Sequence, residues 1–266
     1  MHGGETPRPP FEGPVRHIYV HVPFCRARCD YCAFASVAVG GGGSGTDVPR
    51  LFDAYVEGVA AEWERERAAH DVRRLRTLYL GGGTPSLLGP DRLERLLTVF
   101  RPHLTPQAEV TVEVNPEDAG TEFAAWAAGA RRSPGSGALR GVRISLGVQS
   151  FLPELRAALG RTAHADPRAA FDRLRAAGVT NIGLDLIHGI PGQTPELLAG
   201  DIATVLDLRP DHVSWYELDV ACLLYTSDAA DDLLCVDLGG RRIINKNTTL
   251  IHVHTKVPSY RCRSLS

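Results

Sequence analysis

Short apolar runs alternate with amphipathic stretches along the first 220 residues, and this rhythm constrains the fold more than any other feature. The runs are partly β-branched or aromatic, as is typical of strands that are buried on both faces. They predict six strands, at residues 17–22, 76–80, 108–114, 142–148, 181–187 and 212–218. The stretches between them predict five helices, at residues 49–70, 91–100, 122–129, 166–177 and 195–208.

A repeated strand–helix order predicts parallel strands joined by right-handed crossovers, which places the chain in the α/β class. A doubly wound sheet and a partial barrel both satisfy this order. In either fold, ligands bind at the carboxyl ends of the strands. Glycine-rich or polar segments follow five of the predicted strands, at residues 25–32, 81–83, 113–115, 149 and 188–192. We therefore expect one site at this rim.

Composition and charge exclude several classes of function. The formal net charge is −2, and no basic excess points to nucleic acid. No run approaches the roughly 18 apolar residues of a membrane span. Residues 1–15 form a polar, Pro- and Gly-rich leader without the apolar core of a signal peptide. We expect a cytoplasmic protein.

The last part of the chain differs from the rest. Arginine supplies every fixed positive side-chain charge in residues 1–220, whereas both lysines, Lys246 and Lys256, lie beyond Cys222. The strand–helix rhythm also stops there. We therefore expect residues 221–266 to be an irregular tail that does not belong to the native fold, and residues 16–220 to form the folded domain.

Three cysteines, Cys25, Cys29 and Cys32, lie within eight residues at the spacing C-x3-C-x2-C. Such spacing in a cytosolic chain favours metal chemistry over disulfides. Three thiolates can hold a 4Fe–4S cluster and leave one iron open to a small molecule. The spacing alone also allows a zinc site with His21 or His17 as fourth ligand, or three unrelated buried thiols.

The wider segment YVHVPFCRARCDYCAF (19–34) resembles the radical S-adenosylmethionine (SAM) superfamily, and within it the branch of oxygen-independent coproporphyrinogen III oxidases and HemW heme chaperones. Further motifs match in order: LYLGGGTPSLL (78–88), EVNPE (113–117), SLGVQSF (145–151), LGRTAHAD (159–166), LDLIHGIPGQT (184–194) and DHVSWYEL (211–218). The resemblance implies a partial (β/α)6 barrel of the radical SAM type, truncated at about strand six.

The resemblance also implies roles for individual residues. Cys25, Cys29 and Cys32 would hold the cluster, which cleaves SAM reductively with an electron from a donor such as flavodoxin or ferredoxin. The contacts to SAM would come from Tyr19, Gly82, Gly83, Thr84, Glu113, Gln149, Arg161 and Asp185. The residues by themselves also allow a plain tight turn at the glycines and an ion pair between Glu113 and an arginine at the rim.

Phe34 separates the two branches of this family. The oxidases carry a further cysteine two residues after the third, and this chain has Phe34 there. The resemblance therefore implies a heme chaperone, with heme or porphyrin as ligand and transient contacts to heme-receiving proteins. The alternative is oxidative decarboxylation of coproporphyrinogen III to protoporphyrinogen IX. Whether the protein is an enzyme stays open, and the heme-linked segment expected after Leu218 is replaced by the tail.

Overall fold

The computed structural model describes residues 14–40, 47–130, 141–161, 165–218, 235–236 and 250–253. Most of the predicted leader and tail therefore lies outside the described residues. Within the described ranges, no helix is long and apolar enough to cross a membrane.

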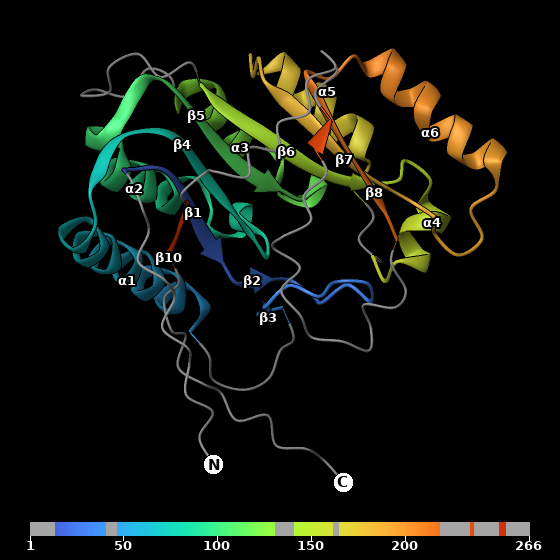
Figure 1. The fold of residues 1–266 in the computed structure, drawn as a ribbon. Coiled ribbons are helices and arrows are strands. Elements are labelled where there is room, and N and C mark those ends of the chain that lie inside the picture. Colours follow the sequence, from blue (N-terminus) through green and yellow to red (C-terminus); the bar gives the residue numbers. More distant parts are fainter. Residues whose placement is uncertain are drawn as a thin grey trace, which may run out of the picture.

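An eight-stranded sheet forms the centre of the molecule (Figure 1), in the order β10-β1-β4-β5-β6-β7-β8-β9. Its six central strands are parallel and confirm the six predicted ones: β1 (Val15–Val22), β4 (Val72–Gly82), β5 (Leu104–Val114), β6 (Val142–Gln149), β7 (Ile182–His188) and β8 (His212–Glu217). They follow one another in chain order without a reversal. A doubly wound sheet needs such a reversal, so the fold is the partial barrel.

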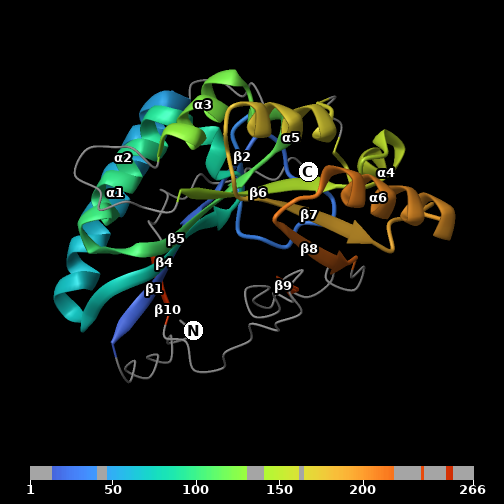
Figure 2. The same cartoon turned by 90° about the horizontal axis from the view of Figure 1, so that it is seen from above.

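The helices lie together on one side of the curved sheet (Figure 2), which makes the structure a half-barrel. They are α1 (Val48–Ala69), α2 (Pro90–Phe100), α3 (Thr121–Gly129), α4 (Pro153–Ala158), α5 (Pro167–Ala176) and α6 (Pro195–Leu208). Five of them confirm the predicted helices, and α4 was not predicted.

The two faces of the sheet differ in polarity. One row of residues in register across five strands is fully buried and apolar: Val20, Leu80, Val112, Ile144 and Ile182. Successive side chains on a strand point to opposite faces. The next row, at the residues just before these, carries Tyr19, Tyr79, Thr111 and Arg143 on the first four strands. One face of the sheet is therefore apolar, whereas the other carries hydroxyl and charged groups.

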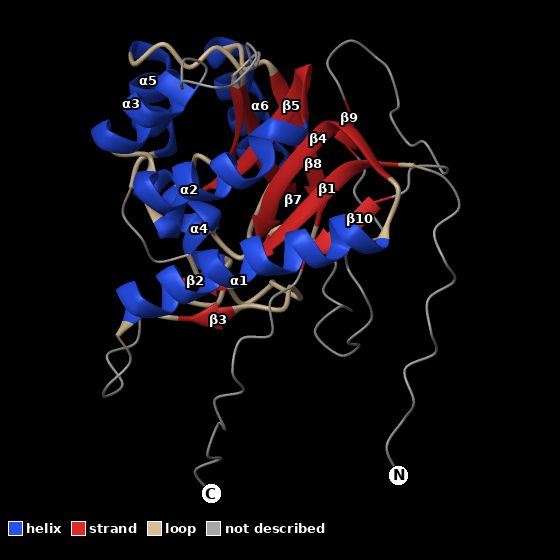
Figure 3. Ribbon diagram, turned by 90° about the vertical axis from the view of Figure 1, so that its left-hand side faces the viewer, coloured by secondary structure: helices blue, strands red, loops and turns tan. Residues whose placement is uncertain are grey.

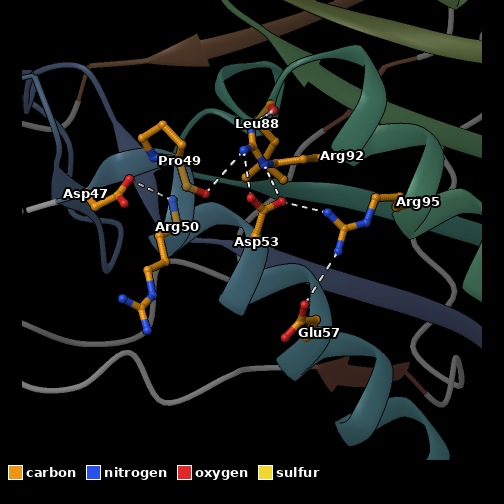
Figure 4. Close-up of polar contacts among 8 residues, drawn as sticks. All are labelled: Asp47, Pro49, Arg50, Asp53, Glu57, Leu88, Arg92 and Arg95. Atoms are coloured by element: carbon orange, nitrogen blue, oxygen red, sulfur yellow. Dashed lines mark hydrogen bonds and ion pairs between the residues drawn. The ribbon is translucent and has the colours of Figure 1, made fainter.

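Helices α1 and α2 pack through apolar residues and are joined at the surface by ion pairs (Figure 4). Trp63 of α1 is fully buried against Phe100 of α2, with ring centroids 5.0 Å apart. Arg92 donates two hydrogen bonds to Asp53, at 2.9 and 3.0 Å, and Arg95 donates a third at 2.6 Å. Because exposed ion pairs contribute about 0–1 kcal/mol each, the buried apolar contact dominates this packing.

Two minor sets of strands complete the fold. Strands β2 (Phe24–Cys25) and β3 (Val37–Ala38) form a separate parallel pair beside α1 (Figure 3), where Phe24 contacts Phe52 at 4.8 Å between ring centroids. In the predicted tail, β10 (Leu250–Val253) pairs with β1, and β9 (Cys235–Val236) pairs antiparallel with β8. The described tail residues thus extend both edges of the sheet.

Candidate functional site

A cavity of about 260 Å³ lies at the carboxyl ends of the strands, where the sequence predicts the site. Its walls come from the cysteine-containing loop after β1, the ends of β4, β5 and β6, and the segment that follows α4. Predicted site residues that line it are Cys25, Cys29, Cys32, Gly82, Gly83, Thr84, Glu113, Gln149 and Arg161. The topology therefore brings together residues that lie up to 136 positions apart in the chain.

The loop that carries the three cysteines is held in place by its own backbone and by one ion pair. The N–H of Val37 donates to Pro23 O at 2.7 Å, and the N–H of Val39 donates to Cys25 O at 2.8 Å. Arg26 donates to the buried Asp118 carboxylate at 2.5 Å, which ties the loop to the segment after β5. The two ends of the loop are thus bonded to each other, and its first part is tied to the segment after β5.

The three thiols are free, half-buried and turned to the same cavity. Burial raises the pKa of the Cys25 thiol, while hydrogen bonds from Thr84 and Ser36 act in the opposite direction. Burial also raises the pKa of Cys32, against a hydrogen bond from the Phe34 backbone. Only a thiolate can bind a metal, and with a raised pKa these two thiols keep their protons at neutral pH. Binding of a soft metal would release those protons.

The three cysteine thiols are better placed to hold a metal cluster than a single metal ion. No three or more His, Cys, Asp or Glu side chains in the described part of the chain are arranged to hold a single metal ion. The three thiols instead border a cavity with room beside them. Soft thiolates next to open space suit an iron–sulfur cluster with a free coordination position.

The histidines that a zinc site would need are engaged elsewhere. His17 shares a hydrogen bond with the Thr77 hydroxyl through Nδ1 at 2.9 Å. His21 donates from Nε2 to Ala35 O at 2.8 Å, and its Nδ1 lies 3.3 Å from the Tyr19 hydroxyl. Neither histidine lines the cavity. The arrangement therefore does not favour zinc with either histidine as fourth ligand.

The glycine turn at the end of β4 has a packing role as well as a place in the cavity wall. A Cβ on Gly83 would lie 2.6 Å from Phe24 O, and one on Gly82, which has φ +108°, would lie 2.4 Å from His21 Nδ1. The N–H groups of Gly83 and Thr84 donate to Val22 O and Phe24 O, each at 2.7 Å. Only glycine allows the turn to approach the start of the cysteine loop so closely.

Glu113 is partly buried and lines the cavity. Its carboxylate accepts from the Tyr79 hydroxyl at 2.7 Å and from the Gly82 N–H at 3.0 Å. Burial raises the pKa of Glu113 to about 7, although these two hydrogen bonds act in the opposite direction. The sequence also allowed an ion pair between Glu113 and an arginine at the rim. In the structure, the partners of Glu113 are instead these two neutral donors.

Gln149 ends β6 in a left-handed backbone conformation, with φ +65°, which is uncommon outside glycine. The turn behind it is fixed by the buried Asp201 of α6, which accepts from the Ser150 hydroxyl and the Phe151 N–H, both at 2.8 Å. Strain of this kind is kept only where surrounding structure enforces it, and such positions cluster at functional sites.

Arg161 reaches into the cavity from the segment after α4. Its Nη1 donates to Asn115 Oδ1 at 3.1 Å and to Gly147 O at 3.0 Å. It also bonds to the Tyr31 hydroxyl, and burial raises the pKa of Tyr31 to about 12, so the phenol is protonated at neutral pH. The Nε of Arg161 is buried without a hydrogen-bond partner among the described residues. The guanidinium is thus held in place by three bonds from its other nitrogen atoms.

Two predicted contacts, Tyr19 and Asp185, do not line the cavity. The Tyr19 ring stacks on Tyr79 at 5.8 Å between centroids. Asp185 accepts from the Ser145 hydroxyl at 2.9 and 3.1 Å, and burial raises its pKa. Their contacts with SAM stay predictions.

Sequence reasoning gave no individual role to two residues of this network. Asn115 lines the cavity and bonds to both Arg161 and Thr84, and Tyr79 supports Glu113 from the neighbouring strand. Asn115 stands two positions after Glu113 in the motif EVNPE, so it could have been found there. Tyr79 stands in the motif LYLGGGTPSLL, but that motif does not show that strand register places Tyr79 beside Glu113.

The fold and its rim define a parallel α/β half-barrel with a cysteine-lined ligand site. The family model of the radical SAM superfamily matches residues 19–203, and the chain belongs to this superfamily. Membership implies a 4Fe–4S cluster and SAM.

Several curated relatives are heme chaperones named HemW. The chain is 38% identical to that of Lactococcus lactis over 204 residues, which cover 75% of this chain and 48% of the relative. It is 38% identical to that of Mycobacterium tuberculosis (strain H37Rv) over 215 residues, with coverages of 79% and 51%. It is 36% identical to that of Escherichia coli K12 over 211 residues, with coverages of 78% and 51%. The chain spans about half the length of the curated relatives it matches.

One solved structure shares the fold over most of the chain. The coproporphyrinogen III oxidase HemN of Escherichia coli, a radical SAM enzyme, aligns with a TM-score of 0.62 and 24% sequence identity. The alignment covers 91% of this chain and 52% of that one. This likeness supports the half-barrel.

Proposed function

We propose that Cys25, Cys29 and Cys32 hold a 4Fe–4S cluster and that the adjoining part of the cavity takes SAM. The observation that carries this proposal is the convergence of three free thiols from one loop on a cavity at the carboxyl rim of a half-barrel. A reduced cluster of this kind, once bound, supplies the electron that breaks the carbon–sulfur bond of SAM.

The protein's own residues would bind and orient the cosubstrate. The guanidinium of Arg161, which lines the cavity, complements the SAM carboxylate. The Glu113 carboxyl complements the cationic amino group, and a cation there would favour its ionised form. Gly82 and Gly83 allow the ligand to approach their backbone because they carry no side chain.

SAM binding to Arg161→Gln tests this arrangement. Because a hydrogen bond to a charged group contributes about 1.5–3 kcal/mol, we expect the Kd for SAM to rise about 10- to 100-fold at unchanged iron content. Equilibrium dialysis of anaerobically reconstituted protein measures it. Arg168→Gln is the matched control, since Arg168 pairs with Asp207 at the exposed surface. An unchanged Kd in Arg161→Gln would contradict the assigned role.

We further infer a heme-chaperone function of the HemW type, with heme or porphyrin as ligand, a one-electron donor such as flavodoxin or ferredoxin, and transient contact with heme-receiving proteins. Phe34 supports this choice over the oxidase, because it lines the cavity and is 41% exposed where an oxidase carries a further thiol. The identity to the HemW relatives also supports it. The free thiols of the site favour a reducing compartment, the cytoplasm.

Two assays separate the chaperone from the oxidase. Hemin titration should produce a saturable shift of the Soret band, and anaerobic incubation with coproporphyrinogen III, SAM and a reductant should leave that porphyrinogen unchanged. Formation of protoporphyrinogen IX would contradict the chaperone function and support the oxidase function. Zinc without iron or sulfide after anaerobic purification would exclude both.

A further inference from the structure

A chain of hydrogen bonds runs from Arg161 through two side chains to one cluster cysteine. Arg161 Nη1 lies 3.1 Å from Asn115 Oδ1, and Asn115 Nδ2 lies 3.2 Å from Thr84 Oγ1. Thr84 Oγ1 in turn lies 3.8 Å from Cys25 Sγ. Three separate segments of the chain, after β4, after β5 and after α4, are thus linked in series to one sulfur atom.

The chemistry of the donors gives this chain a single direction. A guanidinium only donates, so the Asn115 amide must turn its oxygen toward Arg161 and its NH2 group toward Thr84. The Thr84 oxygen therefore accepts from Asn115, and the hydroxyl hydrogen is left for the Cys25 sulfur. Because each bond polarises the next, the permanent charge of Arg161 strengthens the last donor in the series.

The backbone holds the intermediate residues in place. Thr84 is 4% exposed, and its N–H donates to Phe24 O at 2.7 Å. The Asn115 N–H donates to the Ser86 hydroxyl at 3.4 Å, and that hydroxyl donates to Asp118 at 2.8 Å. Asp118 also holds Arg26 of the cysteine loop, so the hydroxyl and the sulfur are fixed by one shared network.

We propose that Thr84 and Asn115 are positioning residues that raise the reduction potential of the cluster by directing a hydrogen bond onto the Cys25 sulfur. This inference rests on the proposed function. Hydrogen bonds to cluster sulfurs stabilise the additional negative charge of the reduced state and are one of the means by which proteins set the potential.

The midpoint potential of the reconstituted cluster tests the inference. It is measured by EPR-monitored redox titration without SAM, so that a SAM contact by the same side chains cannot contribute. In Thr84→Val we expect the ratio of reduced to oxidised cluster at the wild-type midpoint to fall about tenfold, a shift of about 59 mV to lower potential for one electron. Thr84→Ser keeps the hydroxyl and should keep the wild-type midpoint. Thr204→Val, a change on the exposed face of α6, is the control.

A double-mutant cycle separates relay from local packing. Asn115→Ala should lower the midpoint while Thr84 is present and should lower it little in the Thr84→Val background, because both act through one hydroxyl. A wild-type midpoint in Asn115→Ala would overturn the inference even if Thr84→Val fails to retain a cluster. A wild-type midpoint in Thr84→Val would overturn it while the cluster itself stands. Absence of a 4Fe–4S cluster from the wild-type protein would instead reject the proposed function.

Discussion

At the residue scale, the inner face of the half-barrel brings ionisable groups into a setting with little water. Glu113 is held by a phenol and a backbone N–H, and Asp185 by the Ser145 hydroxyl. Neutral donors offset only part of the cost of burying a carboxylate, so burial raises the pKa of both groups. A cation bound beside either carboxyl would lower its pKa again.

This environment makes stability depend on pH. The pKa of Glu113 is about 7 in the folded protein and about 4.3 in the unfolded chain, so the folded state binds more protons between these values. Stability therefore falls as the pH rises from about 4 to 7. In Glu113→Gln, we expect the loss between pH 5 and 8 to be smaller by on the order of 2 kcal/mol, measured by urea unfolding of the cluster-free protein. Equal losses in both proteins would show that Glu113 titrates normally.

Sequence motifs identified most of the site residues, but not how these residues contact one another. The cysteines, the glycine turn, Gln149 and Arg161 could be found because each stands in a motif after a strand. The contact between Tyr79 and Glu113 depends on strand register, which a motif does not encode. The position of Tyr19 outside the cavity depends on the same register.

At the scale of elements, periodicity predicted the long units and missed the short ones. Helix α4 has six residues, too few to show a helical period. Strand β4 begins at Val72 rather than at 76, because its first residues are largely charged and exposed and do not form an apolar run. The pair β2–β3 has two residues in each strand and is defined only by tertiary contacts.

The contact between the glycine turn and the cysteine loop is the critical junction of elements. A methyl group on Gly83 would meet the backbone of Pro23 and Phe24, which cannot move without displacing the loop. We expect Gly83→Ala to lower the free energy of unfolding by about 1–3 kcal/mol and to reduce the iron content after reconstitution.

The matched control is Gly129→Ala, at the end of α3, where a new Cβ meets no atom within 4 Å. Since alanine favours helices over glycine, this variant should be unchanged or more stable by up to about 1 kcal/mol. Wild-type stability and iron content in Gly83→Ala would show that the junction is not critical. Urea unfolding measures the free energy of unfolding of both variants, and iron analysis measures their iron content after reconstitution.

At the scale of the whole molecule, the order of the strands in the sheet determines the fold, which the local sequence patterns left open. The strand–helix rhythm allows a doubly wound sheet or a partial barrel, and only the serial order of the six central strands selects the barrel. This order places all the carboxyl ends on one rim, so that residues from distant motifs share a cavity. That residues 221–266 do not belong to the native fold stays a prediction, although the described segments there pair with the sheet edges.

The central claim is that Cys25, Cys29 and Cys32 together hold one 4Fe–4S cluster. Iron and acid-labile sulfide analysis with EPR after anaerobic reconstitution tests it most directly, in the wild type and in Cys25→Ala, Cys29→Ala and Cys32→Ala. Cys222→Ala is the control outside the motif. The account predicts about four irons and four sulfides per chain in the wild type and the control, and loss of the cluster in each of the three variants. Retention of the wild-type cluster in any one of the three would contradict it.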